Sequence, residues 1–246
     1  MYKGRKDFYL KEPVRDLTGV PSLSTHRVQK VLEVIKVRGY AAKTFLDIGC
    51  GDGEITLVIA KALKCNDIYG VDISPEAVRL AREKGVKAYQ LDVEENDLQF
   101  NDMFFDVVYC GELIEHVFNP DKVIRDIYRV LKNGGLAIIT TPNLACWYNR
   151  IAMLLGYQPF HYSATIENYD VGCFPLLRKG SVSGRAHIRT MTYKAFKELL
   201  RRHGFKIVSM KGAGTATGTH TLDQLNRLIS RFPSLASYLI ALVEKP

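Results

Sequence analysis

A group of glycines and acids follows the first short apolar stretch of the chain. Residues 44–48 read TFLDI, and GCGDGE follows at 49–54. Glycine permits a tight turn and lets a ligand lie against bare backbone. Asp72 ends a second apolar stretch, 23 residues beyond Gly49, and an acid at that distance is placed to bind the hydroxyls of a ribose. The spacing indicates a nucleoside site.

Two further strand ends carry residues that suit the same site. Asp92 follows a predicted strand at 86–90, where its carboxylate can accept a hydrogen bond from an adenine amino group. Cys110, Gly111 and Glu112 follow a predicted strand at 105–109. Ligands of open α/β sheets bind at the carboxyl ends of the strands. Four strand ends therefore offer parts of one adenosine-shaped site.

The acids around the glycine loop favour a cationic ligand over a diphosphate. In the dinucleotide fingerprint G-x-G-x-x-G/A the third small residue permits close helix packing, but here that position is Glu54. Asp47 and Asp52 add two more carboxylates, and each close like-charge contact costs on the order of 1 kcal/mol near a surface. S-adenosylmethionine carries a sulfonium and an ammonium and no phosphate. The loop thus argues against a nicotinamide dehydrogenase, and no G-x-x-x-x-G-K-[ST] phosphate loop occurs.

With these motifs the chain resembles the class I S-adenosylmethionine-dependent methyltransferases. The resemblance is carried by FLDIGCGDGE, VDIS, LDV and FDVVYCGELIEHVFNPDKVIRDIYRVLKNGGLAIITTPN. It covers roughly residues 40–145, is weaker at 187–212 and in the last strand, and is similar to the small-molecule type that includes quinone-biosynthesis methyltransferases. It implies in-line transfer of a methyl group from S-adenosyl-L-methionine to an O, N or C nucleophile of a small molecule, with S-adenosyl-L-homocysteine as the product.

The resemblance also implies which residues contact the donor. They all lie at the strand ends described above. Asp47, Gly49 and Gly51 would cradle the methionine part, Asp72 with its neighbour Ile73 the ribose, and Asp92 with Val93 the adenine, while Cys110 and Gly111 would lie near the sulfonium.

Candidates for proton transfer are three histidines, His116, His161 and His187, with Glu112 and Glu115 as further bases. His116 is also interpreted as a packing or capping residue. Tyr162, in an aromatic segment, and Arg189, in an H-x-R segment, are candidate substrate contacts, and Arg189 would suit an anionic acceptor. Five scattered cysteines without C-x-x-C argue against a zinc or disulfide framework, so no metal site is predicted.

The elements that must position these residues alternate along the chain. Strands are predicted at 44–48, 67–73, 86–90, 105–109 and 136–141, between helices at 24–38, 54–63, 74–84 and 120–131. A helix at 192–203, a strand at 205–210, a helix at 222–232 and a strand at 238–243 follow. This alternation predicts an α/β fold with a doubly wound, Rossmann-like parallel sheet. The resemblance adds that the sheet has seven strands, with the last one antiparallel between the fifth and the sixth.

The alternation is interrupted at 144–190, where seven aromatic residues fall in 47 positions. We expect a single methyltransferase domain over 1–246, with an N-terminal arm and helix at 1–39 and an aromatic-rich lid or substrate-binding insertion at 144–190. The first residues contain no apolar h-region and no apolar run is long enough to span a bilayer. A cytoplasmic location without a membrane span is therefore predicted.

Charge leaves a second class of acceptor open. Lys and Arg number 34 against 26 Asp and Glu, for a net charge of +8. That excess keeps an RNA (tRNA) methyltransferase as an alternative, but nucleic acid is not favoured. The chain lacks an Asn/Asp-Pro-Pro-Tyr/Phe motif after the fourth strand, and Gly111 rather than a proline-cysteine pair adjoins Cys110. A non-catalytic S-adenosylmethionine-binding module is the other alternative, because a fold does not prove activity.

Overall fold

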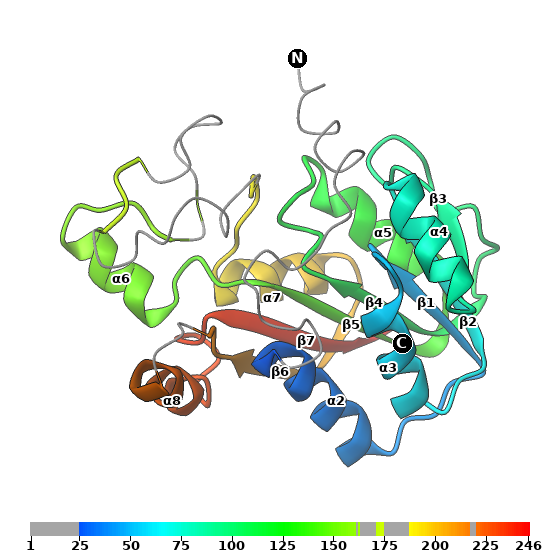
Figure 1. Cartoon of the computed structure of the whole chain (residues 1–246), viewed down its shortest axis with the longest axis horizontal. Helices are drawn as coiled ribbons and strands as arrows, with labels where there is room; N and C mark the ends of the chain where they lie inside the picture. The colour runs from blue at the N-terminus through cyan, green and yellow to red at the C-terminus, as the bar shows by residue number, and fades with distance from the viewer. Residues whose placement is uncertain (1–24, 161, 163–170, 175–186, 217–219) are drawn as a thin grey trace.

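The computed structural model describes residues 25–160, 162, 171–174, 187–216 and 220–246 (Figure 1). A seven-stranded sheet crosses the centre of the molecule in the order β3-β2-β1-β4-β5-β7-β6. The strands are β1 (Thr44–Ile48), β2 (Asp67–Asp72), β3 (Lys87–Gln90), β4 (Phe105–Gly111), β5 (Leu131–Pro142), β6 (Lys206–Ala213) and β7 (Tyr238–Glu244).

Strand directions agree with the prediction. β1 pairs in parallel with β2 and β4, β2 with β3, and β4 with β5. β7 runs antiparallel to both β5 and β6, and it lies between them. The order reverses between β1 and β4, and this switch point is where ligands of doubly wound sheets bind. The predicted fold class is confirmed.

Helices cover both faces of the sheet. α2 (His26–Arg38) and α3 (Glu54–Ala62) share one apolar cluster with one face, and α5 (Pro120–Val130) and α7 (Tyr193–Arg202) cover the other. α4 (Pro75–Glu83) packs beside β2 and β3. Two further helices, α6 (Trp147–Leu154) and α8 (His220–Ile229), lie at the left end of the molecule in Figure 1.

The strand residues alternate between the two cores. Phe45 is buried with α2 and α3, whereas its neighbour Leu46 is buried on the face of α5 and α7. Burying one such side chain contributes about 1.5–3 kcal/mol. This two-sided burial explains why the strands lack a polar face and why the site residues appear only at their ends.

Side-chain caps fix where the helices after the strands begin. Ser74 accepts a hydrogen bond from the N–H of Ala77 at 3.3 Å, and Pro75 opens α4. Asn119 accepts from the N–H of Lys122 at 3.1 Å, and Pro120 opens α5. Both caps satisfy N–H groups that have no partner inside the helix. The segments between β2 and α4 and between β4 and α5 are thereby held at the edge of the sheet.

Three predicted strand boundaries are wrong by two or more residues, and one of them is the end of β6, which lies at Ala213 rather than 210. β5 begins at Leu131 rather than 136, because Asn133, Gly134 and Gly135 stay in the strand as a bulge opposite β4. The N–H of Gly134 donates to the carbonyl of Lys245 at 2.7 Å, which holds that bulge. β4 extends through Gly111, two residues beyond its predicted end, so Cys110 and Gly111 belong to the strand and not to the loop after it.

The helices differ from the prediction in two places. The insertion predicted at 144–190, in which no helix was predicted, contains α6, whose exposed Ile151 and Leu154 hide the helical pattern because both faces carry apolar residues. The helix predicted at 222–232 runs from His220 to Ile229 instead. In the part of the chain that the structure describes, every helix is too short or too polar to traverse a bilayer.

Candidate functional site

The loop after β1 leaves open space where a side chain would normally lie. Gly49, Gly51 and Gly53 have φ values of 80°, 53° and 82°, in the left-handed region that favours glycine. A Cβ placed on Gly51 would meet no atom within 4 Å, whereas one on Gly53 would lie 3.2 Å from Ala81 and Val86. Gly53 is therefore required for packing against α4, and Gly51 for the space above the loop.

Asp72, the last residue of β2, is held rigidly beside this loop. One carboxylate oxygen accepts from the N–H of Gly51 at 2.9 Å and the other from the N–H of Ser74 at 2.9 Å. Burial raises the pKa of Asp72, and these backbone hydrogen bonds oppose the shift. Each oxygen retains a lone pair, so a fixed pair of acceptors remains for hydroxyl groups.

Asp47 lies in β1, just before the glycine loop. The Thr56 hydroxyl donates to its Oδ2 at 2.6 Å, while Oδ1 is buried and has no hydrogen-bond partner among the described residues. Burial raises the pKa of Asp47 to about 7, and nearby Asp72 adds to the shift while the Thr56 hydrogen bond opposes it. An unpaired buried carboxylate oxygen costs free energy unless a donor or cation approaches it.

A cleft of about 480 Å³ opens beside the ends of β2 and β3. Ile73 and Asp92 line it together with Gln90 and Asn96. Asp92 Oδ1 accepts from the N–H of Glu94 at 2.9 Å, which fixes the carboxylate at the rim. The volume lies in the range of small-ligand sites. Val93 packs against the apolar core, and its carbonyl accepts from Lys122 Nζ at 3.1 Å.

The end of β4 is closely packed. A Cβ on Gly111 would lie 2.2 Å from the Tyr109 hydroxyl, so only glycine fits there. Cys110 is fully buried, and burial together with the nearby Glu115 raises its pKa well above its ordinary value. Because a thiolate is the reactive form, Cys110 is a packing residue rather than a nucleophile.

An arginine from α2 reaches the same strand end, and nothing in the sequence pattern pointed to it. The Arg27 guanidinium donates to the Tyr109 hydroxyl at 2.9 Å and lies 3.7 Å from Glu112 Oε1. Glu112 Oε1 also accepts from the Thr140 hydroxyl at 2.9 Å. Glu112 has a φ of 54°, uncommon for a residue other than glycine. These contacts join α2, β4 and β5 at the switch point of the sheet.

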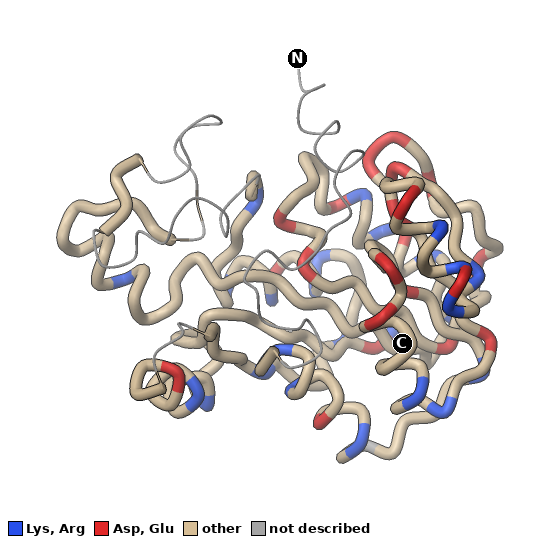
Figure 2. The backbone as a smooth tube through the Cα atoms, viewed as in Figure 1, with Lys and Arg blue, Asp and Glu red and all other residues tan. Residues whose placement is uncertain are grey.

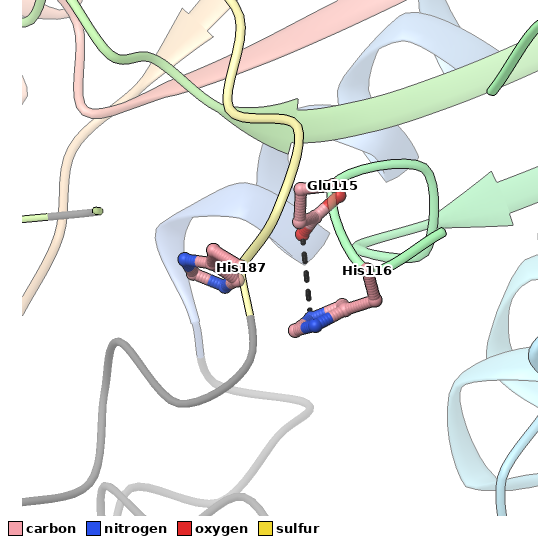
Figure 3. A group of neighbouring side chains, drawn as sticks. All are labelled: Glu115, His116 and His187. Atoms are coloured by element: carbon pink, nitrogen blue, oxygen red, sulfur yellow. Dashed lines mark ion pairs between the residues drawn. The ribbon is translucent and has the colours of Figure 1, made fainter. Parts of the chain in front are cut away.

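Two predicted candidates, His116 and His187, lie together although 71 positions separate them. Their ring centroids are 4.7 Å apart. His116 Nε2 lies 3.8 Å from Oε1 of the fully buried Glu115, while Oε2 of Glu115 accepts from the Thr141 hydroxyl at 3.1 Å. Figure 3 shows Glu115 and His116 on the loop after β4 and His187 on the segment that crosses it. Burial raises the pKa of Glu115 well above its ordinary value, and Glu112 contributes.

The segment of His187 is anchored to the same loop. The N–H groups of Ile188 and Arg189 both donate to the carbonyl of Glu115, at 2.7 and 3.0 Å. Arg189 Nε donates to the carbonyl of Phe118 at 3.2 Å, and the residue is exposed to solvent. The H-x-R segment thus lies across the end of β4.

The aromatic segment is described only in part. His161 lies outside the described residues, so its predicted role is not placed. Tyr162 has 42% of its surface exposed, and its N–H donates to the carbonyl of Pro159. Tyr157 and Phe174 meet edge to face at 5.0 Å, and Trp147 Nε1 donates to Asn226 Oδ1 of α8 at 2.9 Å. The hydrogen bond from Trp147 ties α6 to α8.

The site residues that sequence reasoning missed are the partners of the predicted ones. Thr56, Thr141 and Arg27 hold Asp47, Glu115 and Glu112, respectively. Hydroxyl groups within helices and strands give no sequence signal of their own. Arg27 lies one turn before Val31 in the predicted helix, and its contacts with Tyr109 and Glu112 are visible only in three dimensions.

Acidic residues gather around the site, although the chain is basic as a whole. Figure 2 shows acidic positions along the loops at the upper right of the molecule, and basic positions at its right edge and along its lower side. The loop after β3 alone contains Asp92, Glu94, Glu95 and Asp97. The local electrostatic field therefore favours a cationic ligand and disfavours phosphate.

Comparison with known proteins agrees with this architecture. Residues 46–139 match the family described as "Methyltransferase domain". The chain is 35% identical over 122 residues to the ubiquinone biosynthesis O-methyltransferase of Aliivibrio fischeri. This match covers 48% of the chain and 50% of that protein. The chain spans about half the length of the relatives it matches. The resemblance to S-adenosylmethionine-dependent methyltransferases is confirmed over this segment.

Solved structures share the fold over most of the chain. The PH0226 protein from Pyrococcus horikoshii OT3 matches with a TM-score of 0.63 and 19% identity, covering 98% of this chain and 99% of that one. Magnesium protoporphyrin IX methyltransferase (ChlM) from Synechocystis PCC 6803, solved with bound SAH, matches with a TM-score of 0.56 and 17% identity, covering 89% and 82%. At these identities the likeness concerns the fold.

Proposed function

We propose that the protein transfers a methyl group from S-adenosylmethionine to a nucleophile of a small molecule. The observation that carries this proposal is the buried Oδ1 of Asp47, which has no hydrogen-bond partner among the described residues and lies on the strand that leads into the open loop at Gly51. An ammonium group held by this loop would offset the charge of the carboxylate, whereas a diphosphate would be repelled by it. The matched methyltransferase segment, residues 46–139, contains both residues.

The donor would lie along the ends of β1, β2 and β3. Asp47, Gly49 and Gly51 would hold its methionine part, Asp72 with Ile73 its ribose, and Asp92 with Val93 its adenine; Cys110 and Gly111 would line the space by the sulfonium. When bound, S-adenosylmethionine supplies an activated methyl group on a neutral leaving thioether. The protein then contributes alignment and exclusion of water, worth up to about 7–11 kcal/mol in well-oriented systems.

The acceptor would approach from the end of β4. Without a bound metal ion, His116 or His187, which lie close to each other there, would accept the proton of a hydroxyl or amine acceptor. Arg189 would recognise an anionic group on the acceptor, since its guanidinium is exposed beside the cluster. The segment 144–190, with Tyr162, would act as a lid or substrate wall. Four buried cysteines, Cys50, Cys65, Cys110 and Cys146, are free thiols, which suits work in the cytoplasm.

Donor binding is tested by Asp72→Ala. Removing the fixed acceptors of the ribose hydroxyls should weaken S-adenosylmethionine binding at least tenfold in calorimetry, about 1.4 kcal/mol. Asp67→Ala is a matched control, because Asp67 begins the same strand and pairs with Lys87 at 2.6 Å, away from the loop. Equal affinities of the two variants and the unchanged protein would reject the ribose role of Asp72.

Catalysis is tested separately with a methyl-labelled donor. Quinols, sugars, amino acids and tRNA are offered in turn, and transfer of label to a small molecule is expected. Label recovered in tRNA would instead support the alternative of an RNA methyltransferase. Donor binding without transfer to any acceptor would support the alternative of a non-catalytic binding module.

A further inference from the structure

Three metal-binding side chains converge beside the end of β4. Glu115, His116 and His187 each offer one ligand atom, and these atoms all lie within 4.8 Å of one another. Figure 3 shows that two of them come from the loop after β4 and the third from the segment that crosses it. Three atoms this close share a point within about 2.8 Å of each, and zinc–ligand bonds measure about 2.0–2.1 Å. Small side-chain rotations would bring all three to bonding distance.

One of the three donors has an unsatisfied atom that faces the cluster. Glu115 is fully buried, and its Oε1 has no hydrogen-bond partner in the part of the chain that the structure describes. His116 Nε2 lies 3.8 Å from that oxygen, too far for a hydrogen bond. Two ligands of one tetrahedral zinc ion lie roughly 3.4 Å apart. The gap between these two atoms is thus close to what an ion between them requires.

We propose that Glu115, His116 and His187 bind a divalent transition-metal ion, with Zn²⁺ as the ion that this donor set fits best. Two imidazoles and one carboxylate form a set typical of catalytic zinc sites, which keep a fourth position open. Hard ions such as Mg²⁺ prefer all-oxygen surroundings. No metal site was predicted from the sequence, because His187 lies 71 positions beyond His116 and the three ligands follow no known spacing rule.

Contacts around the cluster hold the ligands in place. The Thr141 hydroxyl occupies Oε2 of Glu115 and leaves Oε1 directed to the imidazoles. The carbonyl of Glu115 accepts the N–H groups of Ile188 and Arg189, so the backbone next to His187 is fixed to the loop that carries the other two ligands. Partners of this kind orient the ligands of metal sites. The neighbouring carboxylate, Glu112, lies 3.7 Å from the Arg27 guanidinium, which supplies positive charge to it but forms no hydrogen bond with Glu115.

A protonated histidine is the competing explanation for the unpaired oxygen. An imidazolium at His116 would form an ion pair with Glu115 without any metal. That explanation gives His187 no role in satisfying Glu115, whereas the metal site requires it. The fourth position would accept water or an oxygen of the methyl acceptor; this last step rests on the proposed function, while metal binding does not.

The test uses the full chain, freed of metal by chelator and dialysis at pH 7.5. Zn²⁺ is titrated by calorimetry, and Co²⁺ by its visible absorption, which reports a tetrahedral nitrogen- and oxygen-bound ion. One equivalent is expected to bind. Glu115→Gln and His187→Asn should each weaken binding at least tenfold. His203→Asn is the matched control, because His203 pairs with Asp121 at 2.8 Å on α5 and should bind as the unchanged protein does.

Absence of one-equivalent binding, or equal binding by His187→Asn and the control, would overturn the proposal. If Glu115→Gln does not fold, as judged by circular dichroism, His187→Asn decides, because His187 is partly exposed and its loss leaves no buried charge. Donor affinity is measured on the same samples with and without Zn²⁺. If the unchanged protein binds Zn²⁺ but not S-adenosylmethionine, the proposed function is contradicted and this inference stands. If it binds S-adenosylmethionine but not Zn²⁺, this inference is contradicted and the proposed function stands.

Discussion

At the scale of single residues, the buried carboxyl of Asp47 lowers the stability of the ligand-free protein at neutral pH, and we propose that it helps to bind the donor. Burial of its carboxyl outweighs the hydrogen bond from Thr56, so the pKa of Asp47 rises to about 7. The folded protein therefore binds a proton there that the unfolded chain releases near pH 4. Its contribution to the free energy of unfolding falls as the pH rises from about 4 to 7. This residue makes the ligand-free protein less stable at neutral pH than in weak acid.

Replacing Asp47 by Asn should stabilise the ligand-free protein and impair donor binding. The amide keeps an oxygen for the Thr56 hydroxyl but carries no charge. We expect the free energy of unfolding to rise by about 2 kcal/mol at pH 8, with a smaller gain at pH 5, and S-adenosylmethionine affinity to fall at least tenfold. Urea denaturation at both pH values and calorimetry measure the two effects.

A matched comparison separates the charge from the hydrogen bond. Thr56→Val removes the donor to Asp47 Oδ2 and keeps the carboxyl, so it should lower stability instead of raising it. If Asp47→Asn destabilises the protein equally at pH 5 and pH 8, the carboxyl is not the protonated, buried group inferred here.

At the scale of elements, the loop between β1 and α3 makes a site through backbone shape. Gly51→Ala adds one methyl group to the open space, where it meets no protein atom. The protein should fold, losing about 1–2 kcal/mol for a left-handed alanine, and bind S-adenosylmethionine at least tenfold more weakly. Gly39→Ala is the control: its φ of 64° imposes similar strain at the end of α2, and its Cβ also meets nothing within 4 Å. Equal affinities of the two variants would show that the loop is only a turn.

Elements were predictable where local chemistry sets them. The helices predicted at 74–84 and 120–131 begin in the structure at Pro75, directly after the Ser74 cap, and at Pro120. The start of β5 was not predictable, because Gly134 remains in the strand through a hydrogen bond to Lys245, far along the chain. α6 was missed for a related reason: contacts with α8, not its own apolar pattern, determine its place.

The candidate site shows the same division. The acids and glycines at the ends of β1 and β2 follow a local motif, so the sequence identifies Asp47, Gly51 and Asp72. Their hydrogen-bond partners depend on packing and carry no motif. The proximity of His116 to His187 arises only when the segment before α7 crosses the end of β4, an arrangement that no spacing in the chain encodes.

At the scale of the whole molecule, net charge and local charge have opposite signs. The chain carries a charge of +8, yet acidic loops surround the ends of β1 to β3 (Figure 2). The net positive charge would attract a polyanion such as RNA to the protein over a long range, but the carboxylates at the donor site would repel its phosphates. A small acceptor bound near Arg189 would not bring phosphates close to these carboxylates. The charge distribution therefore favours a small acceptor over RNA.

The two classes of acceptor respond differently to salt. Any binding of tRNA to this protein should be nonspecific, and its affinity should fall by about 10³-fold or more between 50 and 200 mM salt. The reason is that each phosphate contact releases counterions, and this release becomes less favourable as the salt concentration rises. S-adenosylmethionine binding involves one or two charges in a partly buried site and should weaken less than about fivefold over the same range. Filter binding and calorimetry at both salt concentrations measure this difference. Sequence-selective tRNA binding that persists at 200 mM salt, with label transferred to the RNA, would overturn the assignment of a small-molecule acceptor, because the basic surface would then be a recognition surface.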